Sequence, residues 1–204
     1  MKQIVAIIVM ALFVVTSVSY AQTQKEIKQV EKEAKKEAKE KEKSGWKLLE
    51  PGSLETVVKT HLLKSRYGNM TEIVGTANMK KSINLGKTTA RNNAVNEYAE
   101  GEKSMVKGKI TSGIIDLNEN QIENLAGGFE RRVVAEISGE LRLSYTLYKQ
   151  NKDGSYDVQT IYLVDIEAEA KAKKRAMQLA LEEAELASKY GDAISKFIDG
   201  SFQE

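Results

Sequence analysis

The sequence has 204 residues, with 31 Lys and Arg, 29 Asp and Glu, a single His and no Cys, so the formal net charge is only +2. A balance this close to neutral gives no reason to expect a nucleic-acid partner. The lack of cysteine excludes disulfides, a thiolate nucleophile, a Cys-based zinc site, an iron–sulfur cluster and a lipid-bearing N-terminal cysteine, and one histidine excludes a metal site made of histidines alone.

A signal peptide for export is predicted over residues 1–21. A lysine precedes an unbroken apolar run of 12 residues, 4–15, and the small residues Ser19 and Ala21 follow it. This order is typical of a secretory leader cleaved between Ala21 and Gln22. As a helix the run would rise only about 18 Å, which is too short for a hydrocarbon core of about 30 Å, so no transmembrane segment is expected after cleavage.

A charged arm follows at residues 22–45, where 8 Lys and 6 Glu occupy 14 of 24 positions. Glu and Lys pairs spaced i,i+4 favour a helix with a charged surface. The heptad pattern fails at Glu37 and Lys41, before the three or four heptads that a coiled coil needs. The apolar stripe of the arm is narrow and consists of Ile27, Val30, Ala34 and Ala38.

Three interpretations of the arm stay open: a water-exposed helix, a helix for self-association or partner docking, and a helix on a membrane surface. The first predicts that removing residues 22–44 leaves the domain folded. The second makes the apolar stripe, together with Tyr148 on a later strand, a candidate interaction surface and predicts a homo-oligomer formed through the arm. The third is disfavoured because the stripe lacks Leu, Phe and Trp.

Residues 46–204 are predicted to form a single α+β domain, with a small antiparallel sheet of about three strands packed against long helices. Ser53 is placed to cap a helix that ends at Tyr67-Gly68 and has His61 on its buried stripe. Alternation over residues 71–80 then predicts a strand whose inward side carries Ile73, Gly75, Ala77 and Met79.

A long helix is predicted from about Gly86 to Ile115. Small residues recur along it every seven positions, and this spacing predicts a seam where another element approaches closely. The residues of the seam are Ala94, Gly101 and Gly108.

A second helix, a β-hairpin and a last helix complete the domain. Asn118 with Gln121 predicts a capping box for the second helix. Alternating apolar residues on both sides of a turn at 151–154 predict the hairpin. Residues 161–164 are apolar on both faces of the returning strand, so both faces are expected to be covered. Asp165 is placed to cap the last helix.

Six short motifs accompany this order of elements: Gly45-Trp46-Lys47, Pro51-Gly52, Gly75-Thr76-Ala77, Ala90-x-x-x-Ala94, Tyr145-Thr146-Leu147-Tyr148 and Ile161-Tyr162-Leu163-Val164-Asp165. With them, the sequence resembles the LPP-twenty family of bacterial envelope proteins, in particular exported members without a lipid anchor that carry a charged arm. The resemblance implies an α+β domain in the periplasm or at the cell surface of a Gram-negative-type bacterium, and it offers no catalytic residues.

Three features invite a functional interpretation but favour a structural one. Gly86-Lys87-Thr88-Thr89 lacks the first glycine of a phosphate-binding loop, which would fall at Lys81, so a plain helix start is favoured. His61 is favoured as a packed, hydrogen-bonded or partly exposed histidine over a catalytic or metal-binding one. Strand packing is favoured over a sugar-binding platform for the hairpin tyrosines, which are Tyr145, Tyr148, Tyr156 and Tyr162.

The sequence therefore predicts an exported envelope protein of non-enzymatic structural or interaction type, with no catalytic, metal-binding or cofactor-binding residues and no cofactor. Its expected partner is another envelope protein or a glycan. The alternative is a module that binds a small ligand, a lipid or a glycan in a cleft between sheet and helices. Convergent polar side chains in a mostly apolar pocket would favour this alternative.

Overall fold

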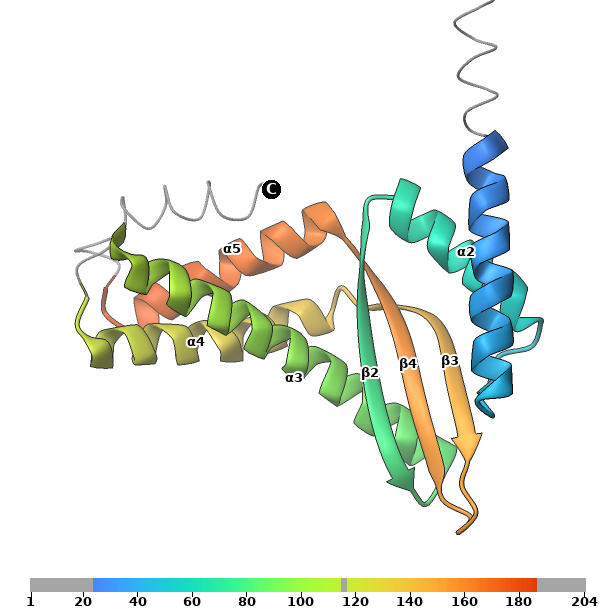
Figure 1. Cartoon of the computed structure of the whole chain (residues 1–204). Coiled ribbons are helices and arrows are strands. Elements are labelled where there is room, and N and C mark those ends of the chain that lie inside the picture. The colour runs from blue at the N-terminus through green and yellow to red at the C-terminus, as the bar shows by residue number, and fades with distance from the viewer. Residues whose placement is uncertain (1–23, 115–116, 187–204) are drawn as a thin grey trace, which may run out of the picture.

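The structure is a computed structural model that describes residues 24–114 and 117–186 (Figure 1). The predicted signal peptide, residues 1–21, lies outside this part, and so does its cleavage site between Ala21 and Gln22. None of the helices in the described ranges is long and apolar enough to cross a membrane.

The α+β fold class is confirmed. The predicted sheet of about three strands was one strand short, because a two-residue strand is too brief to leave a pattern in the sequence. After an N-terminal helix at residues 24–43, the described elements are β1 (Lys47–Leu48), α2 (Leu54–Tyr67), β2 (Met70–Lys80), α3 (Ile83–Lys109), a π-helical turn (Ile110–Ile114), α4 (Glu119–Ser138), β3 (Arg142–Gln150), β4 (Tyr156–Asp165) and α5 (Ile166–Glu183).

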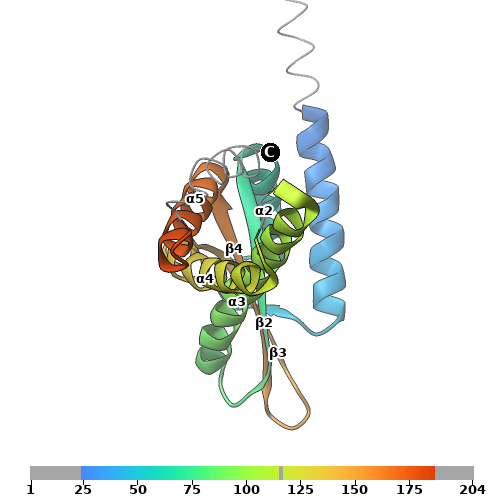
Figure 2. The same cartoon turned by 90° about the vertical axis from the view of Figure 1, so that its left-hand side faces the viewer.

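The four strands form one antiparallel sheet in the order β1-β3-β4-β2, and helices cover both of its faces (Figures 1 and 2). The N-terminal helix and α2 pack on one face, together with Tyr145 and Ile161. The other face meets α3, α4 and α5 through Tyr162 and Val164. Residues 161–164 are buried on both faces, as predicted. Beyond the sheet, α3, α4 and α5 enclose a second apolar core around Phe129.

All three predicted helix caps are confirmed. The Ser53 side chain accepts a hydrogen bond from the backbone of α2, and Asn118 forms a full capping box with Gln121. The Asp165 carboxylate accepts from the backbone N–H groups of Glu167 at 3.0 Å and Ala168 at 3.1 Å. These caps satisfy N–H groups that a helix leaves unpaired at its start, which is why they can be identified from local sequence.

The close contact between α3 and the sheet has a different spacing from the predicted seam. Ala94 is fully buried, but Gly101 and Gly108 are exposed, and a Cβ atom added to either would meet nothing within 4 Å. The seam prediction was wrong at these two glycines because α3 leaves the sheet after its first half and turns another face toward α4 and α5. The small residues that touch the sheet recur every four positions instead, and are Gly86, Ala90 and Ala94.

Gly86 lies within α3 and packs against Val158, where an added Cβ would come 2.3 Å from a Val158 methyl carbon. Helix α3 begins after a cap at Ser82, so Gly86-Lys87-Thr88-Thr89 is helical and not a phosphate-binding loop, in agreement with the favoured interpretation.

Met79 was predicted to face inward on β2, and the structure contradicts this prediction. Its side chain is 68% exposed and its φ is +53°. The pairing of β2 with β4 shifts between Ala77 and Lys80, so the simple alternation of the strand ends before Met79.

The N-terminal helix is part of the folded body. Val30 and Ala34 are fully buried and Ala38 nearly so, against the core formed with α2 and β3. This burial contradicts the interpretation of the arm as a water-exposed helix and reverses the expectation that the domain folds without residues 22–44.

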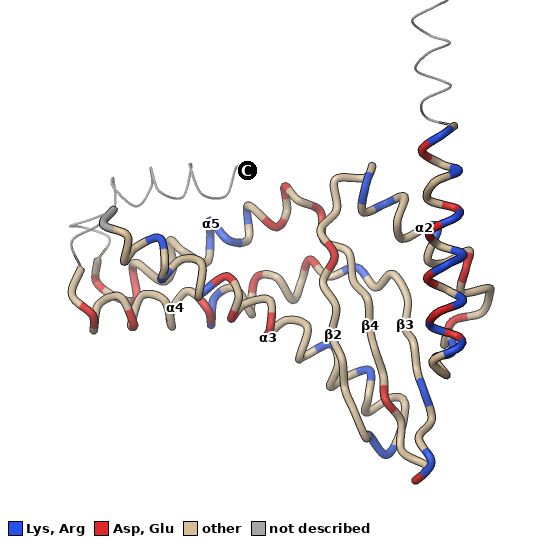
Figure 3. The backbone as a smooth tube through the Cα atoms, in the orientation of Figure 1, with Lys and Arg blue, Asp and Glu red and all other residues tan. Residues whose placement is uncertain are grey.

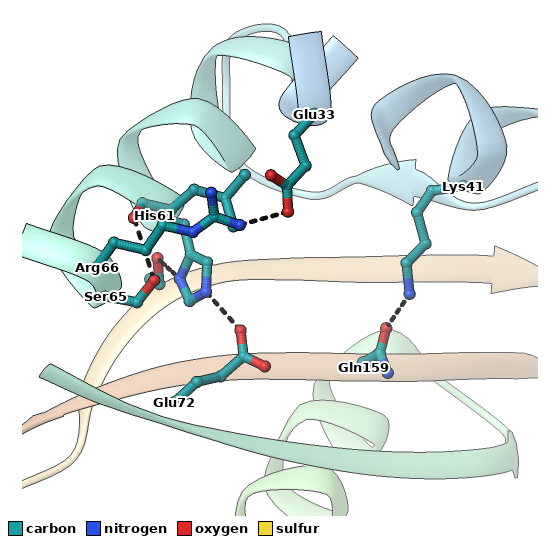
Figure 4. A network of polar contacts seen from close by, with 9 residues as sticks. Glu33, Lys41, His61, Ser65, Arg66, Glu72 and Gln159 are labelled. Atoms are coloured by element: carbon teal, nitrogen blue, oxygen red, sulfur yellow. Dashed lines mark hydrogen bonds and ion pairs between the residues drawn. The ribbon is translucent and has the colours of Figure 1, made fainter. Parts of the chain in front are cut away.

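Polar contacts also hold the N-terminal helix in place (Figure 4). The Lys41 Nζ atom donates to the Gln159 side-chain oxygen of β4 at 3.0 Å, and Arg66 of α2 pairs with Glu33. Lys and Glu recur along the whole length of this helix (Figure 3), and most of them are exposed, so its charge pattern resembles that of a solvated arm.

Candidate functional site

His61 lies on the buried side of α2, facing the sheet, and is only 3% exposed. Its Nδ1 atom lies 3.0 Å from the Ser144 hydroxyl of β3, and its Nε2 atom pairs with the Glu72 carboxylate of β2 (Figure 4). The Tyr145 ring meets the imidazole edge-on, with ring centroids 5.5 Å apart. The structure confirms a packed, hydrogen-bonded histidine, which joins α2 to two strands.

A β-bulge places Ser144 beside His61. The pairing of β3 with β4 shifts between Leu143 and Tyr145, which leaves Ser144 without a partner residue on β4. As a result, Ser144 and Tyr145 both reach His61 although they are consecutive in the strand. A bulge re-aims side chains in this way because it breaks the alternation of the two faces.

In this chain of contacts a serine touches one nitrogen of the histidine and a carboxylate touches the other. Serine hydrolases have a triad with the same contacts, in which the carboxylate orients the histidine that deprotonates the serine. The carboxylate of such a triad is buried, whereas the Glu72 side chain is 45% exposed. Water screens an exposed charge and weakens its hold on the imidazole. The geometry therefore favours a structural role, in which the three residues hold α2 against the sheet.

A cleft of about 400 Å³ opens beside this contact, between α2 and the start of β3; we refer to it as the α2–β3 cleft. It combines three hydroxyl groups, two cationic side chains and several apolar side chains, and none of the described residues that line it is acidic. The residues that line it are Thr56, Val57, Thr60, Lys64, Gly68, Met70, Arg142, Leu143, Ser144 and Leu163.

The two cations of the α2–β3 cleft have no partner among the residues that the structure describes. Neither the Lys64 nor the Arg142 side chain forms a hydrogen bond or ion pair with any of the described residues. Nearby cations on α2 are paired, since Lys59 lies 2.6 Å from Glu31 and Arg66 pairs with Glu33. The cleft therefore presents positive charge that the described residues do not neutralise.

A second polar cluster joins α3 to α5. The Lys173 Nζ atom lies 2.8 Å from Glu102 and 2.7 Å from Glu169, and the Tyr98 hydroxyl donates to Glu169 at 2.7 Å. Burial disfavours the charged form of Glu169, but hydrogen bonds from Lys173, Thr71 and Tyr98 outweigh it and hold the pKa of Glu169 below its usual range. Since these groups neutralise and bond one another across two helices, we interpret the cluster as structural.

Replacing Glu169 with glutamine is expected to lower the free energy of unfolding at pH 7 by about 3 kcal/mol, because it removes one of the two carboxylates that pair with the largely buried Lys173. The lowered pKa fixes the pH dependence. The stabilisation is fully present above the unfolded-state pKa of about 4.3 and is lost as the pH falls through the lower folded-state pKa. Urea denaturation of both proteins from pH 7 down to the acid limit of folding should show the difference shrinking over that window.

The matched control for this experiment is Glu97→Gln, which removes a carboxylate from the exposed face of α3. We expect it to change the free energy of unfolding by less than about 0.5 kcal/mol. Equal losses in the two variants, or a Glu169→Gln effect that does not depend on pH, would contradict the role of the cluster.

The predicted interaction surface is not assembled in the structure. Val30, Ala34 and Ala38 are buried within the chain itself, so they cannot form an exposed surface as predicted. Small alanines let the helix approach the sheet closely, and this is why so narrow a stripe suffices. Ile27 stays partly exposed, and so does Tyr148, which lies on β3 opposite Lys47 of β1.

The hairpin tyrosines do not form a platform. Tyr145 and Tyr162 are buried in the cores on opposite faces of the sheet, while Tyr148 and Tyr156 are partly exposed. Within the described ranges, no group of three or more His, Asp or Glu side chains is placed to hold a metal ion.

Sequence reasoning missed Lys64, Arg142 and Ser144 as members of one cleft. In the sequence, Lys64 and Arg142 are ordinary surface charges that stand 78 positions apart. Only the fold brings them together, because it places α2 beside the start of β3. The bulge at Ser144 has no sequence signal that we could identify.

Comparison of the chain with protein-family models, with characterised proteins and with solved structures finds no match. Function is therefore inferred from the residues and their geometry.

Proposed function

We propose that the protein is an exported envelope protein that acts by binding and not by catalysis. One observation carries the proposal: the side chains best suited to chemistry hold the fold together, while unpaired cations line a cleft. The imidazole of His61 is bonded at both nitrogens, and Lys173 joins two helices. Lys64 and Arg142 have no such structural task in the described residues.

Export is supported by the sequence of residues 1–21, with its basic start, short apolar run and small residues before the cleavage site. The resemblance to the LPP-twenty family supports the same compartment, the periplasm or the cell surface of a Gram-negative-type bacterium. The body from residue 46 to residue 204 has 22 basic and 23 acidic residues, so it offers no overall field that would attract a nucleic acid.

Cell fractionation tests this proposal. The full chain, expressed in a Gram-negative host, should be recovered in the periplasm or the outer-membrane fraction with an N-terminus at Gln22. A variant that lacks residues 2–21 should stay in the cytoplasm. Recovery of the full chain in the cytoplasm with its leader intact would overturn the proposal. If the chain is instead recovered in the periplasm or the outer-membrane fraction, crosslinking in intact cells would identify the protein or glycan that lies beside it.

A further inference from the structure

We propose that the α2–β3 cleft binds a small amphiphile with a single oxyanion head group, a carboxylate or a phosphate. This inference rests on one part of the proposed function, namely that the protein acts by binding. It does not depend on the compartment, so the fractionation result and the binding result can each fail alone.

The head group is assigned by the charges and donors of the cleft. Arg142 presents a planar fork of N–H donors that matches two oxygens of a carboxylate or phosphate, and Lys64 adds a point charge. The Thr56 hydroxyl can donate a further hydrogen bond to an oxyanion while it accepts one from Ser53, whereas the Thr60 hydroxyl already donates to the Thr56 carbonyl oxygen. Because the described lining holds two cations and no acidic residue, a cationic head group would be repelled.

The ligand is assigned an apolar tail because the other walls of the cleft are apolar. Val57, Met70, Leu143 and Leu163 line it, and Leu143 is 46% exposed in the unbound protein. A short hydrocarbon chain on these side chains would remove apolar surface from water. Small-molecule sites combine an apolar lining with a few placed polar groups in this way.

The size of the cleft favours a small ligand over a folded protein. Its volume of about 400 Å³ falls within the range of about 300 to 1,000 Å³ that is usual for small-molecule sites. Only ten residues line it, whereas a stable protein interface uses about 20 to 30 residues on each side. His61 steadies one wall, because it holds the Ser144 hydroxyl and is itself packed between α2 and the sheet.

Isothermal titration calorimetry of the purified protein tests the site with defined probes below their micelle concentrations. Decanoate and decyl phosphate carry the head group and a tail, inorganic phosphate carries the head alone, decanol the tail alone, and decyltrimethylammonium the wrong charge. We expect at least one of the two anionic amphiphiles to bind at least tenfold more tightly than each of the other three. The preference between decanoate and decyl phosphate distinguishes a fatty-acid-like ligand from a phosphate-bearing one.

Substitutions then locate the binding. Arg142→Gln and Lys64→Gln should each weaken binding at least tenfold, while thermal melts show that the variants stay folded. Lys152→Gln, which removes one charge at the opposite end of the β3–β4 hairpin, should leave the affinity unchanged. Failure of both anionic amphiphiles to bind, equal binding of decyltrimethylammonium, or undiminished binding by the double variant of Arg142 and Lys64 would overturn the inference.

Discussion

Replacing Gly75 with alanine is expected to lower the free energy of unfolding by about 3 kcal/mol or more. A Cβ atom built on Gly75 would lie 1.9 Å from the Ala90 carbonyl oxygen and 2.7 Å from the Ala94 Cβ atom. These are not flexible side-chain ends, so the methyl group can fit only if α3 moves away from β2. Overpacking of a tight core costs about 1 to 3 kcal/mol and occasionally more, and a contact with backbone belongs to the upper end.

A hydrogen bond between α3 and β2 also opposes this movement, because the Asn93 side-chain amide donates to the Thr76 carbonyl oxygen at 2.8 Å. Urea denaturation at pH 7, followed by circular dichroism, measures the loss as a lower midpoint at unchanged slope.

Gly101→Ala is the matched control, because it adds the same methyl group to an exposed position of α3 where nothing lies within 4 Å. Alanine is the better helix former by about 1 kcal/mol, so this variant should be slightly more stable than the natural protein. A Gly75→Ala variant as stable as the natural protein would show that α3 and β2 are not in close contact.

The features predicted from the sequence were those with local causes. A helix cap needs one polar side chain a few residues from the N–H groups that it bonds, so Ser53, Asn118 and Asp165 could be identified without knowledge of the fold. The burial of residues 161–164 on both faces could also be predicted from the sequence, because a strand with apolar residues at every position needs cover on both faces.

The features that were missed depend on what lies opposite a residue. The stripe Val30, Ala34 and Ala38 looks too narrow for a core, but small side chains are what a helix needs to lie flat on a sheet. The glycines Gly101 and Gly108 continue the spacing of Ala94, yet α3 has left the sheet where they occur.

The α2–β3 cleft was missed for a related reason. Its two cations come together, with no acidic residue in the described lining, only in the folded chain. The charges of the N-terminal helix illustrate the point, because Glu31 and Glu33 neutralise the α2 cations Lys59 and Arg66 but not Lys64.

The N-terminal helix gives the second large prediction. Ala34→Glu is expected to lower the free energy of unfolding by about 4 kcal/mol or to prevent cooperative folding, because the position is fully buried and a carboxylate there would lose its water without gaining a partner. Removing residues 22–44 should have at least as large an effect, since it takes Ala34 and Ala38 out of the core that they form with Leu54 and Val58 of α2 and Leu147 of β3.

Gln29→Glu serves as the control for Ala34→Glu, because it makes the same change in charge at an exposed position of the same helix and should shift stability by less than about 0.5 kcal/mol. Thermal melts and light scattering of the four proteins measure unfolding and aggregation together. If the shortened protein melts cooperatively at the temperature of the full-length one, the helix is an appendage. If only the Ala34→Glu and shortened proteins lose their cooperative transition, while the Gln29→Glu protein keeps it, the helix completes the core on its face of the sheet, and the fold begins within residues 24–43 and not at Trp46.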